Sequence, residues 1–141
     1  GPLRCAIAGG HADTTVVSAD GLARLYLHMF DDLQVEPPRV PLQCSAEALR
    51  QCFPRDHFDV VHMRNALDHA MDPLSGLTQM LQVTRPGGWV LLRHARNEGL
   101  PGLFRVGLHQ WAFDVADAKT KPRFIIWSPE LRADASAWLL S

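Results

Sequence analysis

One strand–helix–strand segment near the middle of the chain constrains its fold more than any other feature. Residues 58–64 form a mostly apolar run of the kind that is buried on both faces of a parallel sheet. Asp72-Pro73 then predicts a helix over about 73–84, because aspartate caps free N–H groups and proline at the first position needs none. Pro86-Gly87-Gly88 should end that helix, and the apolar run that follows predicts a strand near 88–94. Together these elements predict a right-handed βαβ unit.

The flanking segments extend this pattern in both directions. The β-branched run near 14–19 predicts a strand, and apolar residues at helical spacing predict a helix over 21–32. Two strands near 110–128, separated by a short polar stretch, predict an antiparallel hairpin. The tail 129–141 has the spacing of a final helix. We therefore expect residues 1–141 to form one α/β domain with a mostly parallel sheet that ends in a hairpin.

Composition narrows the class of function. The 141 residues carry 14 Lys and Arg against 15 Asp and Glu, so the net charge of −1 gives no electrostatic case for nucleic acid or an anionic membrane. The three cysteines are an odd number without a C-x-x-C pair, which favours a reducing, cytoplasmic setting. None of the seven histidines has the spacing that places two ligands on one helix face, so no metal site is predicted, and a zinc hydrolase is disfavoured.

The central segment resembles the class I S-adenosylmethionine (SAM) dependent methyltransferases. Phe58-Asp59-Val60-Val61 followed by Asn65–His69 is similar to the family's fourth strand and the loop after it. Asp72-Pro73 with Met80–Leu92 is similar to its helix, its "(K/R)PGG" turn and its fifth strand. The resemblance implies a Rossmann-like three-layer sandwich, SAM as cofactor, and methyl transfer to a small-molecule or glycan-like acceptor.

The resemblance also implies the cofactor-binding residues. Asp20, at the end of the second family strand, matches the acidic position that binds the ribose hydroxyls, although an aspartate there also forms turns and caps. Ser45 and Ala46 match the pair that meets the adenine, with Ser45 in place of the usual acid; Ser45 equally fits a helix cap. Arg64 and Asn65 end the fourth family strand, at the edge where open α/β sheets bind ligands.

We expect the residues that bind the acceptor and remove its proton to lie in the loops that follow these strands. His69 is the candidate base, because its pKa suits proton transfer near neutral pH, and either Asp68 or Asp72 is its candidate orienting partner. The alternative is that His69 only lines the pocket. His109 and Trp111 are candidate acceptor-binding residues in a run rich in apolar side chains, with core packing of Trp111 as the alternative.

One departure from the family pattern has physical consequences. The glycine-rich loop after the first strand is absent, and Gly1, followed by Pro2-Leu3, matches only its end. The resemblance then implies an N-terminally truncated domain that lacks its first strand and binds SAM weakly or not at all. A non-catalytic interaction module that no longer binds cofactor is the alternative function. The expected partners are a small-molecule acceptor and, through exposed central strands, a second copy of the chain.

Overall fold

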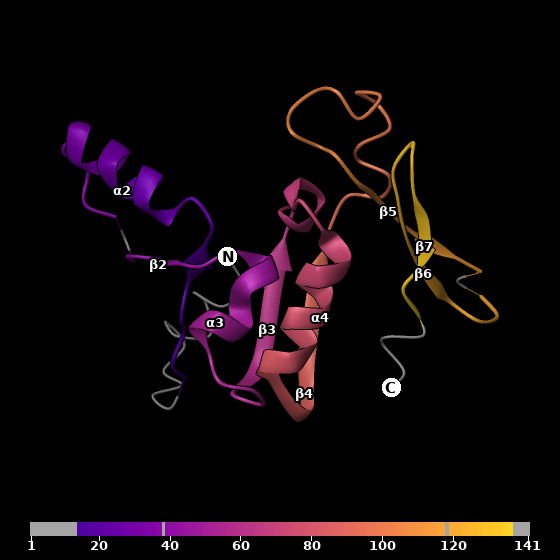
Figure 1. Ribbon diagram of the computed structural model, residues 1–141, viewed down its shortest axis with the longest axis horizontal. Helices are drawn as coiled ribbons and strands as arrows, with labels where there is room; N and C mark the ends of the chain where they lie inside the picture. The colour runs from indigo at the N-terminus through magenta and orange to yellow at the C-terminus, as the bar shows by residue number, and fades with distance from the viewer. Residues whose placement is uncertain (1–13, 38, 118, 137–141) are drawn as a thin grey trace. The chain divides into compact units, whose positions relative to one another are not determined.

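The computed structural model describes residues 14–37, 39–117 and 119–136 (Figure 1). The chain divides into two compact units, residues 1–44 and 45–141, and each is described by itself. The expectations for Gly1-Pro2-Leu3 and for the missing first strand lie outside the described residues.

The first unit contains a short parallel pair of strands joined by one helix. β1 (Ala19–Asp20) pairs with β2 (Leu42–Gln43), and α2 (Ala23–Asp32) lies between them in the chain. The helix confirms the prediction over 21–32. The strand predicted over 14–19 is wrong except at Ala19, since residues 14–18 have no strand structure. β-branched residues favour an extended chain, but a strand also needs a hydrogen-bonded neighbour.

The second unit contains the predicted strand–helix–strand segment. β3 (Phe58–Arg64) pairs in parallel with β4 (Thr84–Arg93), in register from Val60 opposite Trp89 to Arg64 opposite Arg93. The helix between them, α4 (Pro73–Val83), packs alongside both strands (Figure 1). Both predicted strands and the predicted helix are confirmed, and so is their parallel pairing. The expected burial on both faces is wrong, since β3 is only partly buried and Val60, Trp89 and Leu91 are exposed.

Short helical turns flank this segment. η1 (Ala46–Ala48) and α3 (Leu49–Cys52) precede β3, and η2 (Leu67–His69) follows it. Ser45 occupies the position directly before η1. Ser45 therefore occupies a cap position, and two short helical turns follow it.

Glycine is required at two neighbouring positions in the first half of β4, for two separate reasons. Gly87 has a φ of +76°, a left-handed conformation that side chains disfavour. At Gly88 a Cβ would lie 2.8 Å from the carbonyl oxygen of Asp59, which is too close for any other residue. The Pro86-Gly87-Gly88 signal thus marks a place where the two strand backbones nearly touch.

The predicted hairpin is part of a three-stranded antiparallel sheet. β5 (Ala112–Ala116) pairs with β6 (Arg123–Trp127), which confirms the predicted hairpin. This sheet is separate from the β3–β4 pair, so the prediction of one mostly parallel sheet that ends in the hairpin is wrong for the described residues. β6 also pairs with β7 (Arg132–Asp134), so the final helix expected over 129–141 is wrong at these positions; residues 137–141 lie outside the described residues. Burial alternates from Arg132 to Ala135, and this two-residue period suits a strand better than a helix.

A single buried cluster joins α4, η2 and the antiparallel sheet. Its members are fully or almost fully buried: Leu67, Leu77, Phe113, Ile126 and Ala135. Because Leu67 lies in η2, this cluster holds the loop after β3 against β5 and β6.

Two expectations bear on the chain's environment. Cys44 and Cys52 each take part in a disulfide in the structure, whereas the sequence led us to expect reduced cysteines. An odd number of cysteines excludes complete pairing but does not exclude individual disulfides. Within the described residues, no helix has the length and apolar character needed to cross a membrane.

The start of α4 can be tested directly. The Asp72 carboxylate accepts hydrogen bonds from the N–H groups of Leu74, at 3.0 Å, and Ser75, at 3.1 Å. We expect Asp72→Ala to lower the free energy of unfolding by about 1 kcal/mol, as for other N-caps. Asp72→Asn, which keeps the accepting oxygen, should lose much less. Urea unfolding of the three proteins measures the difference, and an equal loss in both variants would contradict the capping role.

Candidate functional site

Three histidines surround one buried aspartate at the carboxyl ends of β3 and β4. Asp68 and His69 belong to η2, in the loop that follows β3, and His94 comes directly after β4. His109 lies in the segment that leads into β5. In open α/β sheets, ligands bind beyond the carboxyl ends of the strands, so this cluster occupies the edge where a site is expected.

The polar atoms of the cluster are close together. The Nδ1 of His109 lies 2.5 Å from the Oδ2 of Asp68, and the Nε2 of His69 lies 3.4 Å from the same oxygen. The two ring nitrogens of His69 and His109 are 3.2 Å apart. The Asp68 side chain is only 1% exposed, whereas those of His69 and His109 are 38% and 28% exposed. The cluster therefore has a buried carboxylate at its base and two imidazole rings open to solvent.

Backbone hydrogen bonds hold the two loops of the cluster together. The carbonyl oxygen of Asp68 accepts from the N–H groups of Gln110, at 3.1 Å, and Trp111, at 3.3 Å. The indole N–H of Trp111 donates to the carbonyl oxygen of Ala70 at 2.9 Å. These three bonds fix the segment that carries His109 onto η2, across about forty positions of sequence. Trp111 also packs against the buried cluster, so the core-packing alternative holds for at least part of its ring.

A glycine makes room for the His109 ring. Gly107 has a φ of +69°, and a Cβ there would lie 3.1 Å from Cδ2 of His109 and 3.3 Å from its Nε2. A side chain at this position would strain the backbone and press on the imidazole. The turn before His109 thus depends on a residue without a Cβ.

His94 is the buried member of the cluster. Its side chain is 5% exposed, its ring packs edge-on against Phe113, and its Nδ1 lies 3.5 Å from the Oδ1 of Asp68. Burial lowers the pKa of His94 below 6.5, and this effect outweighs the opposing attraction of Asp68 and Glu98. Neither ring nitrogen of His94 has a hydrogen bond of good geometry, and neither does the Oδ1 of Asp68.

The structure brings together three of the predicted site residues and adds a fourth. Asp68, His69 and His109 meet as described, with Trp111 beside them. His94 was missed, although its position at the end of the strand predicted over 88–94 carried the relevant signal.

The predicted cofactor residues are more dispersed along the chain. Arg64 ends β3, and Asn65 follows it with its N–H donated to the carbonyl oxygen of Arg93 at 3.0 Å. Ala46 packs against the buried cluster of the second unit. Asp20 belongs to the first unit, and its carboxylate accepts from the N–H of Leu22 at 2.7 Å, the turn-forming alternative. A single cofactor site built from these residues stays a prediction, and Gly1 lies outside the described residues.

The donor set of the cluster suits a metal ion. Asp68, His69 and His109 are the group, among the described residues, that could hold a cation with one ligand atom each. Of the three histidines that the disfavoured zinc hydrolase would use, His57, His62 and His69, only His69 is part of it. Spacing along one helix could not reveal this group, because its donors come from separate loops.

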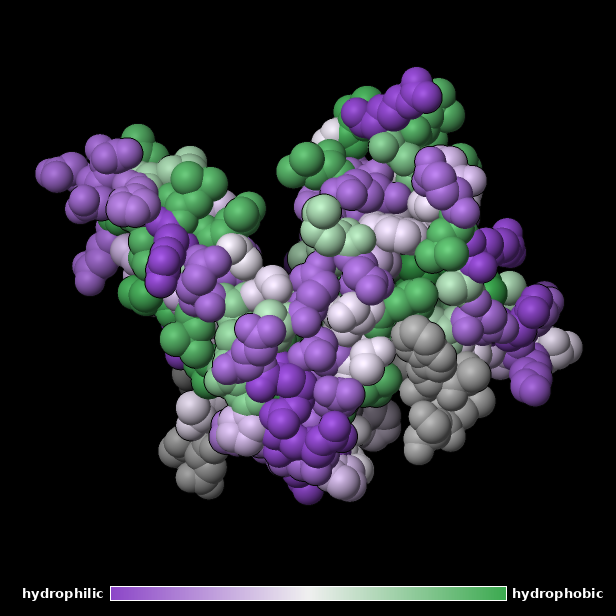
Figure 2. Space-filling model, viewed as in Figure 1, coloured by the Kyte–Doolittle hydropathy of each residue, from purple (hydrophilic) through white to green (hydrophobic). Residues whose placement is uncertain are grey.

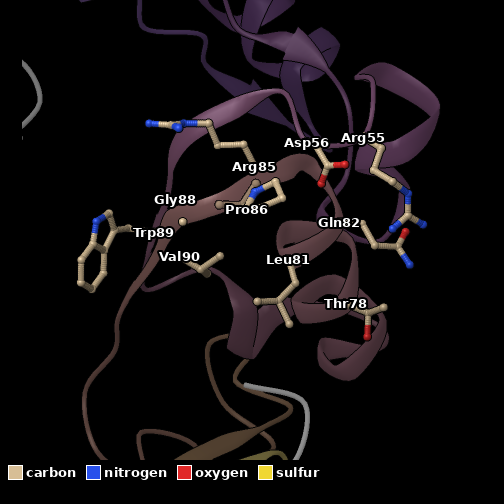
Figure 3. Close-up of a pocket in the computed structure, with 12 residues that line it drawn as sticks. Arg55, Asp56, Thr78, Leu81, Gln82, Arg85, Pro86, Gly88, Trp89 and Val90 are labelled. Atoms are coloured by element: carbon tan, nitrogen blue, oxygen red, sulfur yellow. The ribbon is translucent and has the colours of Figure 1, made fainter. Parts of the chain in front are cut away.

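A surface pocket lies at the other ends of the same strands. It is formed by residues from the start of β4, the end of α4 and the turn before β3 (Figure 3). This pocket lies at the amino ends of β3 and β4, away from the edge that carries the cluster. A second pocket, of about 430 Å³, is lined by Phe104, Gln110 and Trp111, among others, and Gln110 directly follows His109 in the chain. Its volume is that of a small-molecule site.

Comparison with known proteins identifies the family. A family model described as a methyltransferase domain matches residues 12–130, so the chain belongs to this family. This confirms the resemblance to class I SAM-dependent methyltransferases and, with it, the α/β class of the fold. An uncharacterized methyltransferase of Schizosaccharomyces pombe is 40% identical over 43 residues, which span 30% of this chain and 16% of that protein. No solved structure matches.

The buried state of His94 predicts an acid-sensitive fold. Because its pKa is below 6.5 in the folded protein, the unfolded chain binds more protons as the pH falls through 6.5. The free energy of unfolding should therefore decrease below that pH. Urea unfolding of metal-free protein at about pH 7.5 and pH 5.5 measures the decrease, which His94→Leu should reduce and His57→Leu should leave in place. An unchanged decrease in His94→Leu would contradict this assignment.

Proposed function

We propose that the protein transfers a methyl group from SAM to a small-molecule or glycan-like acceptor at the carboxyl ends of β3 and β4. The observation that carries the proposal is the joint position of Asp68, His69 and His109 at this edge, within the region that matches the methyltransferase family. SAM supplies a methyl group on a sulfonium centre, and the residues of this chain hold and deprotonate the acceptor.

The residues of the chain fit the cofactor in their chemistry. One oxygen of the Asp20 carboxylate is used by the N–H of Leu22, and a carboxylate has further lone pairs for the two ribose hydroxyls. Asn65 lies at the carboxyl end of β3 with a φ of +44°, and its backbone N–H is already used, so its side-chain amide is the group offered to a ligand. Arg64, Ser45, Ala46 and Gly1 complete the proposed cofactor contacts.

His69 is proposed as the base that removes a proton from the acceptor. Its side chain is 38% exposed, and its Nε2 faces the Asp68 carboxylate, so the other ring nitrogen, Nδ1, is the atom proposed to meet an acceptor O–H or N–H. When the ring takes up a proton, the buried Asp68 carboxylate 3.4 Å away stabilises the resulting charge. The backbone bonds to Gln110 and Trp111 keep Asp68 in place, so no rearrangement is needed during the transfer.

The second pocket is the proposed acceptor-binding region. Phe104 and Trp111 give it aromatic surface, and Gln110 gives it a polar group. An aromatic wall with a few polar groups suits the apolar face and the hydroxyls of a sugar-like ring. His109 and Trp111 would thus contact the acceptor from the same segment.

Activity of base variants tests the proposed chemistry. With radiolabelled SAM and a panel of hydroxylated small molecules and oligosaccharides, we expect the full protein to methylate at least one acceptor. His69→Gln should lower kcat by about 10²- to 10⁴-fold, the range for loss of a general base. His57→Gln, an exposed histidine before β3, is the matched control and should keep wild-type kcat. Full activity of His69→Gln would contradict the role of His69.

Cofactor binding is tested separately by Asp20→Ala in the full protein. Loss of hydrogen bonds from the ribose hydroxyls to a charged group should weaken SAM binding by about 1–3 kcal/mol. Calorimetry measures the affinity, and Asp59→Ala provides a control at an exposed aspartate that pairs with Arg85. Equal SAM affinity in wild type and Asp20→Ala would remove Asp20 from the site.

A further inference from the structure

We propose that Asp68, His69 and His109 form a binding site for a divalent transition metal ion of the zinc type. This inference rests on the geometry and chemistry of the three side chains. It does not depend on methyl transfer, and its principal tests measure metal binding alone.

The spacing of the three donor atoms is close to that around a tetrahedral ion. Zinc bonds to nitrogen and oxygen are about 2.0–2.1 Å long, so ligand atoms lie about 3.3 Å apart. The His69–His109 and His69–Asp68 distances, 3.2 and 3.4 Å, match this value. The His109–Asp68 distance of 2.5 Å is shorter, and a small rotation of the exposed His109 ring would open it.

Hydrogen bonding within the cluster leaves the buried carboxylate incompletely satisfied. If both rings donate to the Oδ2 of Asp68, the contact from His69 is long at 3.4 Å. The Oδ1 of the same carboxylate is buried without a hydrogen-bond partner. In the described part of the chain, the ion pairs of Asp68 are with histidines alone and none is with lysine or arginine. A buried carboxylate without such a partner is costly, and a bound cation would offset that cost.

The donor types indicate which ion would bind. Two imidazole nitrogens and one carboxylate oxygen favour zinc and similar transition metals, whereas magnesium and calcium prefer oxygen ligands. Three protein ligands leave a fourth position for water or for an oxygen of a bound molecule. The partial exposure of His69 and His109 provides a path for the ion from solvent.

His94 would act as a positioning residue for this site. Its Nδ1 faces the Oδ1 of Asp68 at 3.5 Å, on the side of the carboxylate away from the other two rings. Residues in this outer position orient a ligating carboxylate, and their loss typically weakens metal binding about 10- to 100-fold.

Metal binding and proton transfer would exclude one another at His69, because an ion on Nε2 leaves the ring's one proton on Nδ1, which then cannot take a second proton from the acceptor. Metal-free protein would carry the proposed base, and metal-loaded protein would not. Zinc is therefore expected to inhibit methyl transfer. If zinc binds but the loaded protein stays active, the metal site stands and the base role of His69 is overturned, so the two proposals fail separately.

Calorimetry with zinc chloride alone, on untagged, chelator-treated protein, tests the site. We expect one ion per chain, with binding lost or weakened at least 100-fold in His109→Ala and Asp68→Asn. The exposed His57→Ala is the matched control and should bind as wild type does. Absence of binding, or wild-type affinity in His109→Ala, would overturn the proposal.

A second test uses only the wild-type protein, so its result does not depend on whether a variant folds. Replacing zinc with cobalt in the wild-type protein should give the intense visible absorption of a tetrahedral site, which excess zinc removes. Histidine ring NMR signals of His69 and His109 should move on addition of zinc, and that of His57 should not. Weak octahedral absorption together with unmoved ring signals would show that the histidines hydrogen-bond to Asp68 only, and the proposal would fail.

Discussion

The buried carboxylate of Asp68 is the group on which the candidate site depends. Its side chain faces three histidines from three different loops, and its backbone oxygen receives the N–H groups of Gln110 and Trp111. A buried charge must be paired or hydrogen-bonded, so the surrounding loops can relax only within narrow limits. Removing Asp68 would leave the loops after β3, after β4 and before β5 without their common partner.

The antiparallel sheet is the support for this arrangement. Asn97 ties the chain after β4 to that sheet, since its N–H donates to the carbonyl of Phe113 and its side-chain oxygen accepts from the indole of Trp127. Asn97 has a φ of +54°, a conformation that asparagine tolerates better than most residues. The loop that continues from it exposes Leu103 and Leu108. Figure 2 shows hydrophobic surface in the part of the view where Figure 1 draws this loop. The sheet therefore fixes both ends of this loop while its middle faces solvent.

Local sequence patterns correctly predicted those parts of the fold that depend on residues close together in the chain. Asp72-Pro73 caps α4 as expected, and the glycines after that helix serve a turn and a close backbone approach. The strand predicted over 14–19 failed because β-propensity does not supply a pairing neighbour. The helix predicted over 129–141 is wrong because the spacing of Leu131 and Ala135 fits a helix as well as a strand. The two-residue alternation of β7 is visible only in the burial of its residues, where it pairs with β6.

The sequence identified most residues of the candidate site, but it did not show that they lie together. His69 and Asp68 follow a strand, and the rule that ligands meet the carboxyl ends of parallel strands selects them. The same rule applied to the next strand selects His94. His109, however, reaches Asp68 across forty-one positions, and only the bonds of Trp111 to η2 bring it there. A search for metal ligands by their spacing along one helix therefore fails here. The two imidazole donors, His69 and His109, come from different segments of the chain and meet only in the folded structure.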